Sequence, residues 1–160
     1  LAKLLAGGDL ISVCRRLQVI ASEDIGLAYS QGAILTRACV ESARELGLPE
    51  AALPLAHAVV ALATAPKSNS THDAYYAALT DVNKGKGAMP PRTLQNVHFD
   101  GANSSTKGQN YKYPHSYPNH YVRQQYLPDD LKNSRYYTFG DNKTEQAAKA
   151  YWEKIKGITH

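Results

Sequence analysis

The chain has 160 residues, with 18 Lys and Arg against 14 Asp and Glu, and a formal net charge of +4. Its length indicates one domain, and a hydrophobic content of 43% argues against wholesale disorder. No apolar run is long enough to cross a bilayer. Two cysteines can supply neither a disulfide scaffold nor a four-cysteine zinc site.

The charge is distributed unevenly along the chain. Residues 1–80 carry a net charge of −1, whereas residues 81–160 carry +5 and eight of the eleven tyrosines. Such an asymmetry raises the question of an anionic partner, such as nucleic acid, but does not by itself answer it. The chain also begins at Leu1 inside an apolar pattern, without an initiator Met or a signal-peptide pattern, so we interpret it as part of a longer protein.

The first half predicts helices separated by Gly and Pro. Gly ends helices through its left-handed conformation, Pro opens or stops them, and Asp or Ser caps their first turn. The expected segments are a turn that ends at Gly7-Gly8, a helix from the cap Asp9 to about Ser22, a helix from the cap Ser30 to Leu46, a helix within Pro49–Ala65, and a helix from Ser68 to near Gly85. Pro54 predicts a bent or delayed start of the fourth segment.

Apolar residues at helical spacing indicate which faces point inward. In the second segment these residues are Leu10, Val13, Cys14, Leu17, Ile20 and Ala21. In the third they are Ile34, Leu35, Ala38, Cys39 and Leu46. Short loops and abundant Ala favour close helix packing, so the predicted fold class is an all-α helical bundle.

The second half is predicted to be mostly irregular before a final helix. Gly and Pro interrupt residues 85–141, in which only 121–127 suggests a short helix that Pro128 ends. Asn142 and Glu145 have the capping-box spacing before a helix Lys143–Lys156, which Gly157 would close. Its apolar stripe is Ala147, Ala150, Tyr151 and Ile155. We expect a single domain 1–160, with a bundle over 1–84, an irregular region 85–141 and the C-terminal helix 142–157.

Two groups of residues are candidates for binding anions. Lys67, Ser68 and Asn69 stand before a predicted helix, where free backbone amides favour an anion or an interface; the alternative is an ordinary Ser cap. The second group interleaves aromatic rings with cations, which suits single-stranded nucleic acid, although the rings could equally lie against the bundle. Its members are Tyr111, Lys112, Tyr113, Arg123 and Arg135.

The remaining polar groups predict structural roles. Glu23 and Asp24 at a helix end would cap the next helix or bind a cation such as Arg44 or Lys67, in preference to acid–base work. Cys14 and Cys39 read as small core residues, and His57 as a hydrogen-bonded core or interface residue. The histidines lack metal-ligand spacing, so we expect no metal site. No nucleophile–base pair can be assembled, so we expect no catalytic site in this chain.

Several blocks of the sequence together resemble the RarA/MgsA family of AAA+ ATPases of replication-associated recombination, which are related to the Werner-helicase-interacting ATPase. The longest block is residues 15–28, RRLQVIASEDIGLA, with the signature residues Arg15, Arg16, Ser22, Glu23, Asp24 and Gly26. Further blocks are 65–69 (APKSN), 111–115 (YKYPH), 124–128 (QQYLP) and 135–137 (RYY). The segment 92–110 departs from the family pattern.

The resemblance implies a C-terminal domain that is helical, similar to the clamp-loader collar, and forms a homotetramer. It places the AAA+ core and lid upstream of this chain, so that ATP and Mg are expected there and no cofactor here. It implies a DNA-dependent ATPase acting at replication forks and in recombination and repair, in the bacterial cytoplasm at the nucleoid, with single-strand-binding protein as a partner and no membrane. The alternative is a stand-alone nucleic-acid-binding module built on the Tyr/Lys/Arg-rich second half.

Overall fold

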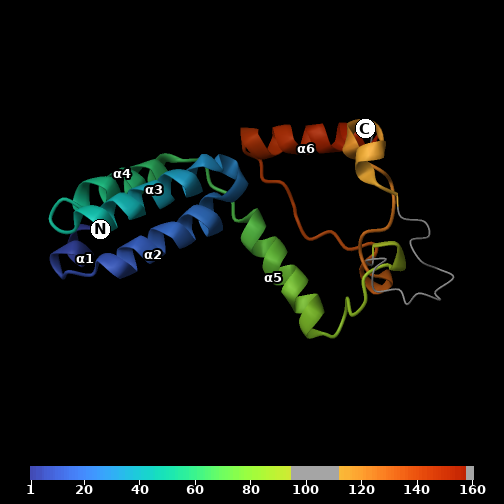
Figure 1. Cartoon of the computed structure of the whole chain (residues 1–160), viewed down its shortest axis with the longest axis horizontal. Coiled ribbons are helices and arrows are strands. Elements are labelled where there is room, and N and C mark those ends of the chain that lie inside the picture. The colour runs from blue at the N-terminus through green and yellow to red at the C-terminus, as the bar shows by residue number, and fades with distance from the viewer. Residues whose placement is uncertain (95–111, 158–160) are drawn as a thin grey trace. The chain divides into compact units, whose positions relative to one another are not determined.

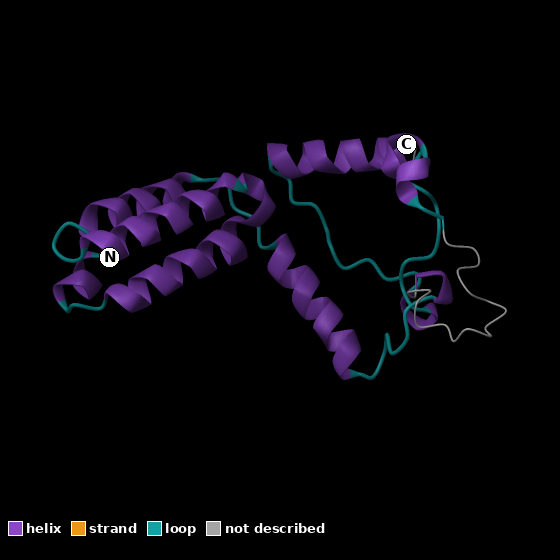
Figure 2. Cartoon of the chain, viewed as in Figure 1, coloured by secondary structure: helices purple, strands orange, loops and turns teal. Residues whose placement is uncertain are grey.

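The computed structural model describes residues 1–94 and 112–157, and over these residues the chain consists of helices and loops without a strand (Figures 1 and 2). The predicted all-α class is therefore confirmed. The chain divides into two compact units, one of Leu1–Tyr75 with Tyr137–Lys149 and the other of Tyr76–Tyr136 with Ala150–His160. In the described part, no helix is both long enough and apolar enough to span a membrane.

The core of the first unit is a small helical bundle. The short helix α1 (Ala2–Ala6) leads into α2 (Leu10–Ile20), which packs against α3 (Gln31–Leu46) and α4 (Ala52–Thr64). The core residues are Val13, Cys14, Leu17, Ala21, Ile25, Cys39, Val40, Ala43, Ala51, Leu55, Ala58 and Leu62. The inward face predicted for α2 is confirmed, and both cysteines are buried as free thiols.

The inward face of α3 differs from the prediction in part, since Cys39 is buried and Leu35 packs against the core as predicted. Ile34, Ala38 and Leu46 are exposed, and the buried residues are Gly32, Thr36, Cys39, Val40 and Ala43. The physical reason is the close approach of α3 to neighbouring side chains: a β-carbon on Gly32 would lie 3.4 Å from Leu62 Cδ2 and 3.2 Å from Tyr29 Cδ1. Small residues permit this approach, so packing selects them over the larger apolar residues.

The helix ends follow local rules in most places. Asp9 caps α2 as predicted, since its Oδ1 accepts a hydrogen bond from Ser12 N at 3.0 Å. Ser30 was predicted to cap α3, but its side chain makes no capping bond because the preceding turn already has helical backbone angles. The delayed start of α4 is confirmed: the helix begins at Ala52 and so places Pro54 in its first turn, where a missing N–H is tolerated.

Two further helices follow the bundle. Helix α5 (Ser70–Asn83) leads toward Gly85, whose φ is +80°. Helix α6 (Lys143–Lys156) has its predicted bounds, and Asn142 Oδ1 accepts a hydrogen bond from Glu145 N at 3.0 Å. Most of its predicted apolar stripe is exposed to solvent, and the fully buried residue of α6 is Glu145.

The helix predicted at 121–127 is wrong. The backbone is extended at Tyr121, and no helix is present over this segment. Its glutamines instead bond to neighbouring loop groups: Gln125 Nε2 donates to Leu127 O at 2.8 Å and to Asp129 Oδ1 at 2.9 Å. Such side-chain bonds compete with a helical ladder. Val122 and Leu131 supply the buried apolar residues of this loop region.

Candidate functional site

The signature segment forms a tight turn after α2. Residues Ala21–Ile25 form a single π-helical turn, and Gly26 follows with φ +48°. Its main chain is tied to the segment before α5, because Ser68 N donates to Asp24 O at 2.8 Å. A β-carbon on Gly26 would lie 3.3 Å from Ser68 O. The positive φ and this close approach together explain why the turn takes a glycine.

The other signature side chains lie at the surface. Arg15, Arg16 and Ser22 are exposed, and the carboxylate of Glu23 lies 3.7 Å from His72 Nε2. The predicted pairing of these carboxylates with Arg44 or Lys67 is not among the ion pairs of residues 1–94 and 112–157, so that expectation is wrong for the described part of the chain. The signature therefore shapes the chain through its backbone.

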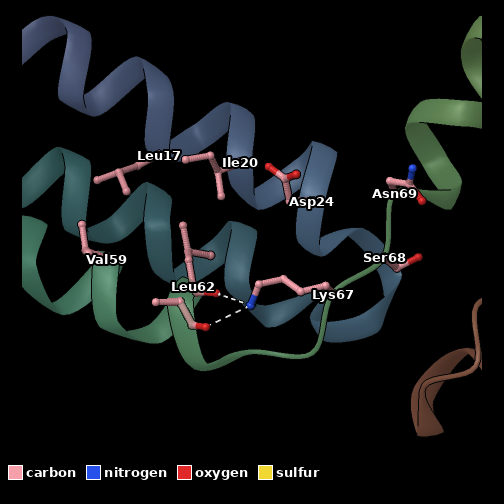
Figure 3. Close-up of a pocket in the computed structure, with 9 residues that line it drawn as sticks. Leu17, Ile20, Asp24, Val59, Leu62, Lys67, Ser68 and Asn69 are labelled. Atoms are coloured by element: carbon pink, nitrogen blue, oxygen red, sulfur yellow. Dashed lines mark hydrogen bonds between the residues drawn. The ribbon is translucent and has the colours of Figure 1, made fainter.

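Lys67 is bound to the end of α4. Its Nζ donates to Leu62 O at 2.9 Å and Ala63 O at 3.1 Å (Figure 3). A cation at a helix C-terminus is favourable, because the carbonyls there have no partner within the helix. Ser68 Oγ accepts from Ser70 N at 3.3 Å, so it binds the first amide of α5, which begins at Ser70 and not at the predicted Ser68. The anion-site reading of Lys67, Ser68 and Asn69 stays a prediction.

A groove of about 660 Å³ lies beside these residues, between α2 and α4 (Figure 3). Its wall is largely apolar, with polar groups at one end. The lining residues are Leu17, Ile20, Asp24, Val59, Leu62, Ala63, Lys67, Ser68 and Asn69. The predicted interface residues therefore lie together at the rim of an apolar groove.

The outer face of α4 is also apolar. Leu53 is 75% exposed and Val60 is 61% exposed, at positions seven residues apart on the same face. His57 lies exposed between them, so its predicted core position is wrong, while the predicted alternative of an interface residue stays a prediction. The whole helix, ALPLAHAVVALAT, contains no charged residue. A helix that is apolar all round is usually covered on all sides. Here α3 and α2 pack against α4 but leave its outer face exposed.

A buried carboxylate holds the start of α6. Glu145 Oε1 accepts from Tyr137 Oη at 3.0 Å, and Oε2 accepts from the Gly140 amide. Burial raises the pKa of Glu145, but hydrogen bonds from Ser68, Gly140 and Tyr137 outweigh it, so its pKa lies below the ordinary value. Burial and the neighbouring Glu145 raise the pKa of Tyr137 to about 12. The group holds α6 in place. The one sign of it in the sequence is the capping-box spacing of Asn142 and Glu145.

In the second unit, two of the predicted nucleic-acid contacts come together. Lys112 and Arg123 line one hollow of about 370 Å³. Gln124 Nε2 donates to Lys112 O at 3.1 Å, which ties the two segments to each other. Gln124, Gln125 and Asp129 are among the other lining residues, so the hollow is polar and carries two cations and one carboxylate.

The remaining members of that predicted group are dispersed. The exposed ring of Tyr113 lies 5.1 Å from that of His115, whose ring lies 4.8 Å from that of His120. Arg135 is exposed and does not line the hollow. Tyr111 falls outside the described residues, as does most of the divergent segment 92–110.

Asp81 organises the loop after α5. It accepts a hydrogen bond from Lys86 Nζ at 2.9 Å and from Tyr136 Oη at 3.0 Å. The bond from Lys86, and after it the bond from Tyr136, lower the pKa of Asp81, and the same Lys86–Asp81 bond, together with the negative charge of Asp81, raises the pKa of Lys86. Asp130 Oδ2 accepts from Gly87 N at 2.8 Å nearby, so the two carboxylates define the course of the chain here.

The described residues form a helical bundle, the signature turn and a C-terminal helix. The family model described as MgsA AAA+ ATPase C terminal matches residues 1–156, and the chain belongs to that family.

Named relatives agree with this assignment. The chain is 46% identical to Replication-associated recombination protein A of Bacillus subtilis over 97% of its length, and 35% identical to the Escherichia coli K12 protein of the same name over 82%. It is 31% identical over 84% of its length to the ATPase WRNIP1 of Dictyostelium discoideum. The matches cover 37%, 30% and 15% of those proteins, respectively, so the chain corresponds to a minor part of each.

Proposed function

We propose that the chain is the assembly domain of a DNA-dependent AAA+ ATPase acting in replication fork maintenance and recombination, and that it joins four copies into a homotetramer. The family membership and the names of its relatives support the setting. In this proposal ATP and Mg bind a core outside the chain, which itself carries no catalytic site. DNA and single-strand-binding protein are the proposed partners of the assembled protein, in the bacterial cytoplasm at the nucleoid.

The observation that carries the assembly role is the uncharged helix α4 with its exposed outer face. Leu53 and Val60 are large apolar residues turned to solvent on a helix that has no charge to hydrate it. Burial of these two side chains would be favourable, because each Å² of apolar surface removed from water contributes about 25 cal/mol of free energy. A second copy of an equally apolar face would provide that cover.

Substitution of this face tests the proposal. In the double variant Leu53→Arg/Val60→Arg, two cations would have to lose water at the contact, so the mass in solution is expected to fall toward that of one chain. The matched control is Ile11→Arg, because Ile11 is 79% exposed on α2 away from this face. Light scattering at tens of micromolar measures the mass. An unchanged mass in the double variant would contradict the role of α4.

A second candidate function, binding of single-stranded nucleic acid, has one specific observation in its favour. Lys112 and Arg123 share a polar hollow, and the exposed Tyr113 follows Lys112 in the chain. Cations together with aromatic rings are what such ligands require. Affinity for an oligonucleotide should fall steeply with salt, because bound phosphates release counterions. Lys112→Glu/Arg123→Glu is expected to abolish binding, while Lys149→Glu, a solvent-exposed residue of α6, should change it little. Equal losses in both variants would contradict a site in the hollow.

A further inference from the structure

The groove between α2 and α4 has the form of a seat for one more helix. Leu17 and Ile20 come from α2, and Val59, Leu62 and Ala63 come from α4, so the apolar wall is shared by two neighbouring helices of a three-helix arrangement. A helix laid along such a groove would complete a four-helix bundle, in which apolar side chains of all four helices share one core.

One end of the groove carries a carboxylate, Asp24, and a cation, Lys67. Asp24 lines it there with an exposed side chain, and no cation lies within ion-pair distance of this carboxylate anywhere in residues 1–94 and 112–157. The ammonium of Lys67 is directed to the last carbonyls of α4 and not to Asp24 (Figure 3). An occupant of the groove should therefore be apolar along its length and basic at the end that meets Asp24.

The exposed stripe of α6 has this pattern. Ala147, Ala150, Tyr151 and Lys154 stand at positions i, i+3, i+4 and i+7, and all four are exposed. Tyr151 is 66% exposed. Two alanines allow a close approach of helix backbones, Tyr151 offers a large anchor, and Lys154 supplies the cation at the end of the stripe. This spacing is that of an amphipathic helix bound in a groove.

We propose that α6 of a second copy of the chain lies in this groove, with its exposed stripe against the apolar wall and Lys154 paired with Asp24. This inference rests on the proposed assembly function and adds to it a second contact, separate from the outer face of α4 that carries Leu53 and Val60. Each copy carries both the groove and the complementary helix, so the contact can repeat from copy to copy and close into a ring. The apolar wall and the carboxylate at its end disfavour a nucleic acid as the occupant.

Charge reversal tests the pairing. Asp24→Lys and Lys154→Asp each place like charges at the contact, and each should weaken self-association by about tenfold or more. The double variant Asp24→Lys/Lys154→Asp restores opposite charges and should recover most of the association. Lys149→Asp is the matched control, since it makes the same charge change on a different face of α6 and should leave association near the wild-type value.

The readout is the mass in solution as a function of concentration, with circular dichroism to establish that each variant is folded. Tyr151→Glu serves as a further variant that leaves the groove untouched, and it should also weaken self-association. A monomeric wild-type chain would refute the assembly function itself. An associating wild-type chain with single variants that associate equally well, or with a double variant that recovers nothing, would overturn the α6 contact while leaving the assembly function standing.

Discussion

Replacement of Glu145 tests the physical account of how α6 is held. In Glu145→Gln the side chain keeps its volume but loses its charge, and its NH2 group takes the place of one of the two oxygens that accept from Tyr137 Oη and the Gly140 amide. Glu145 is fully buried, so water cannot replace the lost acceptor. A buried charged group that loses its hydrogen bonds costs about 2–3 kcal/mol, and we expect a decrease of about 2 kcal/mol in the free energy of unfolding at pH 7.

The stabilising effect of Glu145 should also change with pH in a defined direction. The pKa of Glu145 is lowered in the folded chain, so its stabilising effect is present above the unfolded value of about 4.3 and is lost as the pH falls through the folded value. The difference between wild type and Glu145→Gln should therefore be constant from pH 6 to 8 and shrink at lower pH.

Urea unfolding followed by circular dichroism measures this difference. The control is Glu45→Gln, an identical chemical change at an exposed position, which should alter stability by less than about 0.5 kcal/mol. If both variants behave alike at pH 7, or if the difference grows as the pH falls, the carboxylate does not stabilise α6 in the way described.

Three other changes have defined outcomes. Gly26→Ala should lower the free energy of unfolding by about 2 kcal/mol, because φ +48° is strained for alanine and its methyl group meets Ser68 O; calorimetry checks this, and an unchanged melting temperature would contradict it. Lys67→Met should cost roughly 1 kcal/mol by leaving the last carbonyls of α4 unpaired, and the loss should appear as faster amide exchange in α4, whereas exchange at the wild-type rate would argue against the cap. The ultraviolet titration of wild type minus Tyr137→Phe should show one phenol ionising at about pH 12, and ionisation near pH 10 would speak against its bond to Glu145.

Local sequence rules predicted the helices because the signals for them are local. Asp9 and Asn142 cap their helices within three residues of the chain, and the apolar spacing of α2 admits only one inward face. The caps and the apolar spacing depend only on residues that are close along the chain, so they can be recognised from the sequence alone.

The sequence could not supply the features set by distant neighbours. On α3, either the face with Ile34 or the face with Gly32 could point inward. The face with Gly32 does so because Leu62 of α4 approaches it closely. Residues 121–127 contain helix-forming glutamines, yet these bond to Lys112, Leu127 and Asp129 in the fold. The partners of Glu145 come from two other segments, so its burial could not be inferred from a cap spacing.

For the candidate site, too, the sequence indicated the polar residues but not their neighbours in the fold. Lys67, Ser68 and Asn69 were singled out as a polar group before a helix, but the apolar wall beside them comes from α2 and α4. Of the predicted nucleic-acid contacts, Lys112 and Arg123 meet because Gln124 ties their segments together, a contact between residues twelve apart. Residue types indicated the chemistry, and the fold decided which residues share a surface.

The central claim is that this chain assembles with copies of itself. Its most direct test is the mass of the isolated chain in solution, measured by light scattering from 1 to 100 micromolar. The account predicts a species of four times the chain mass of 17.5 kDa, which dissociates on dilution. A single species of 17.5 kDa across the whole range would contradict it.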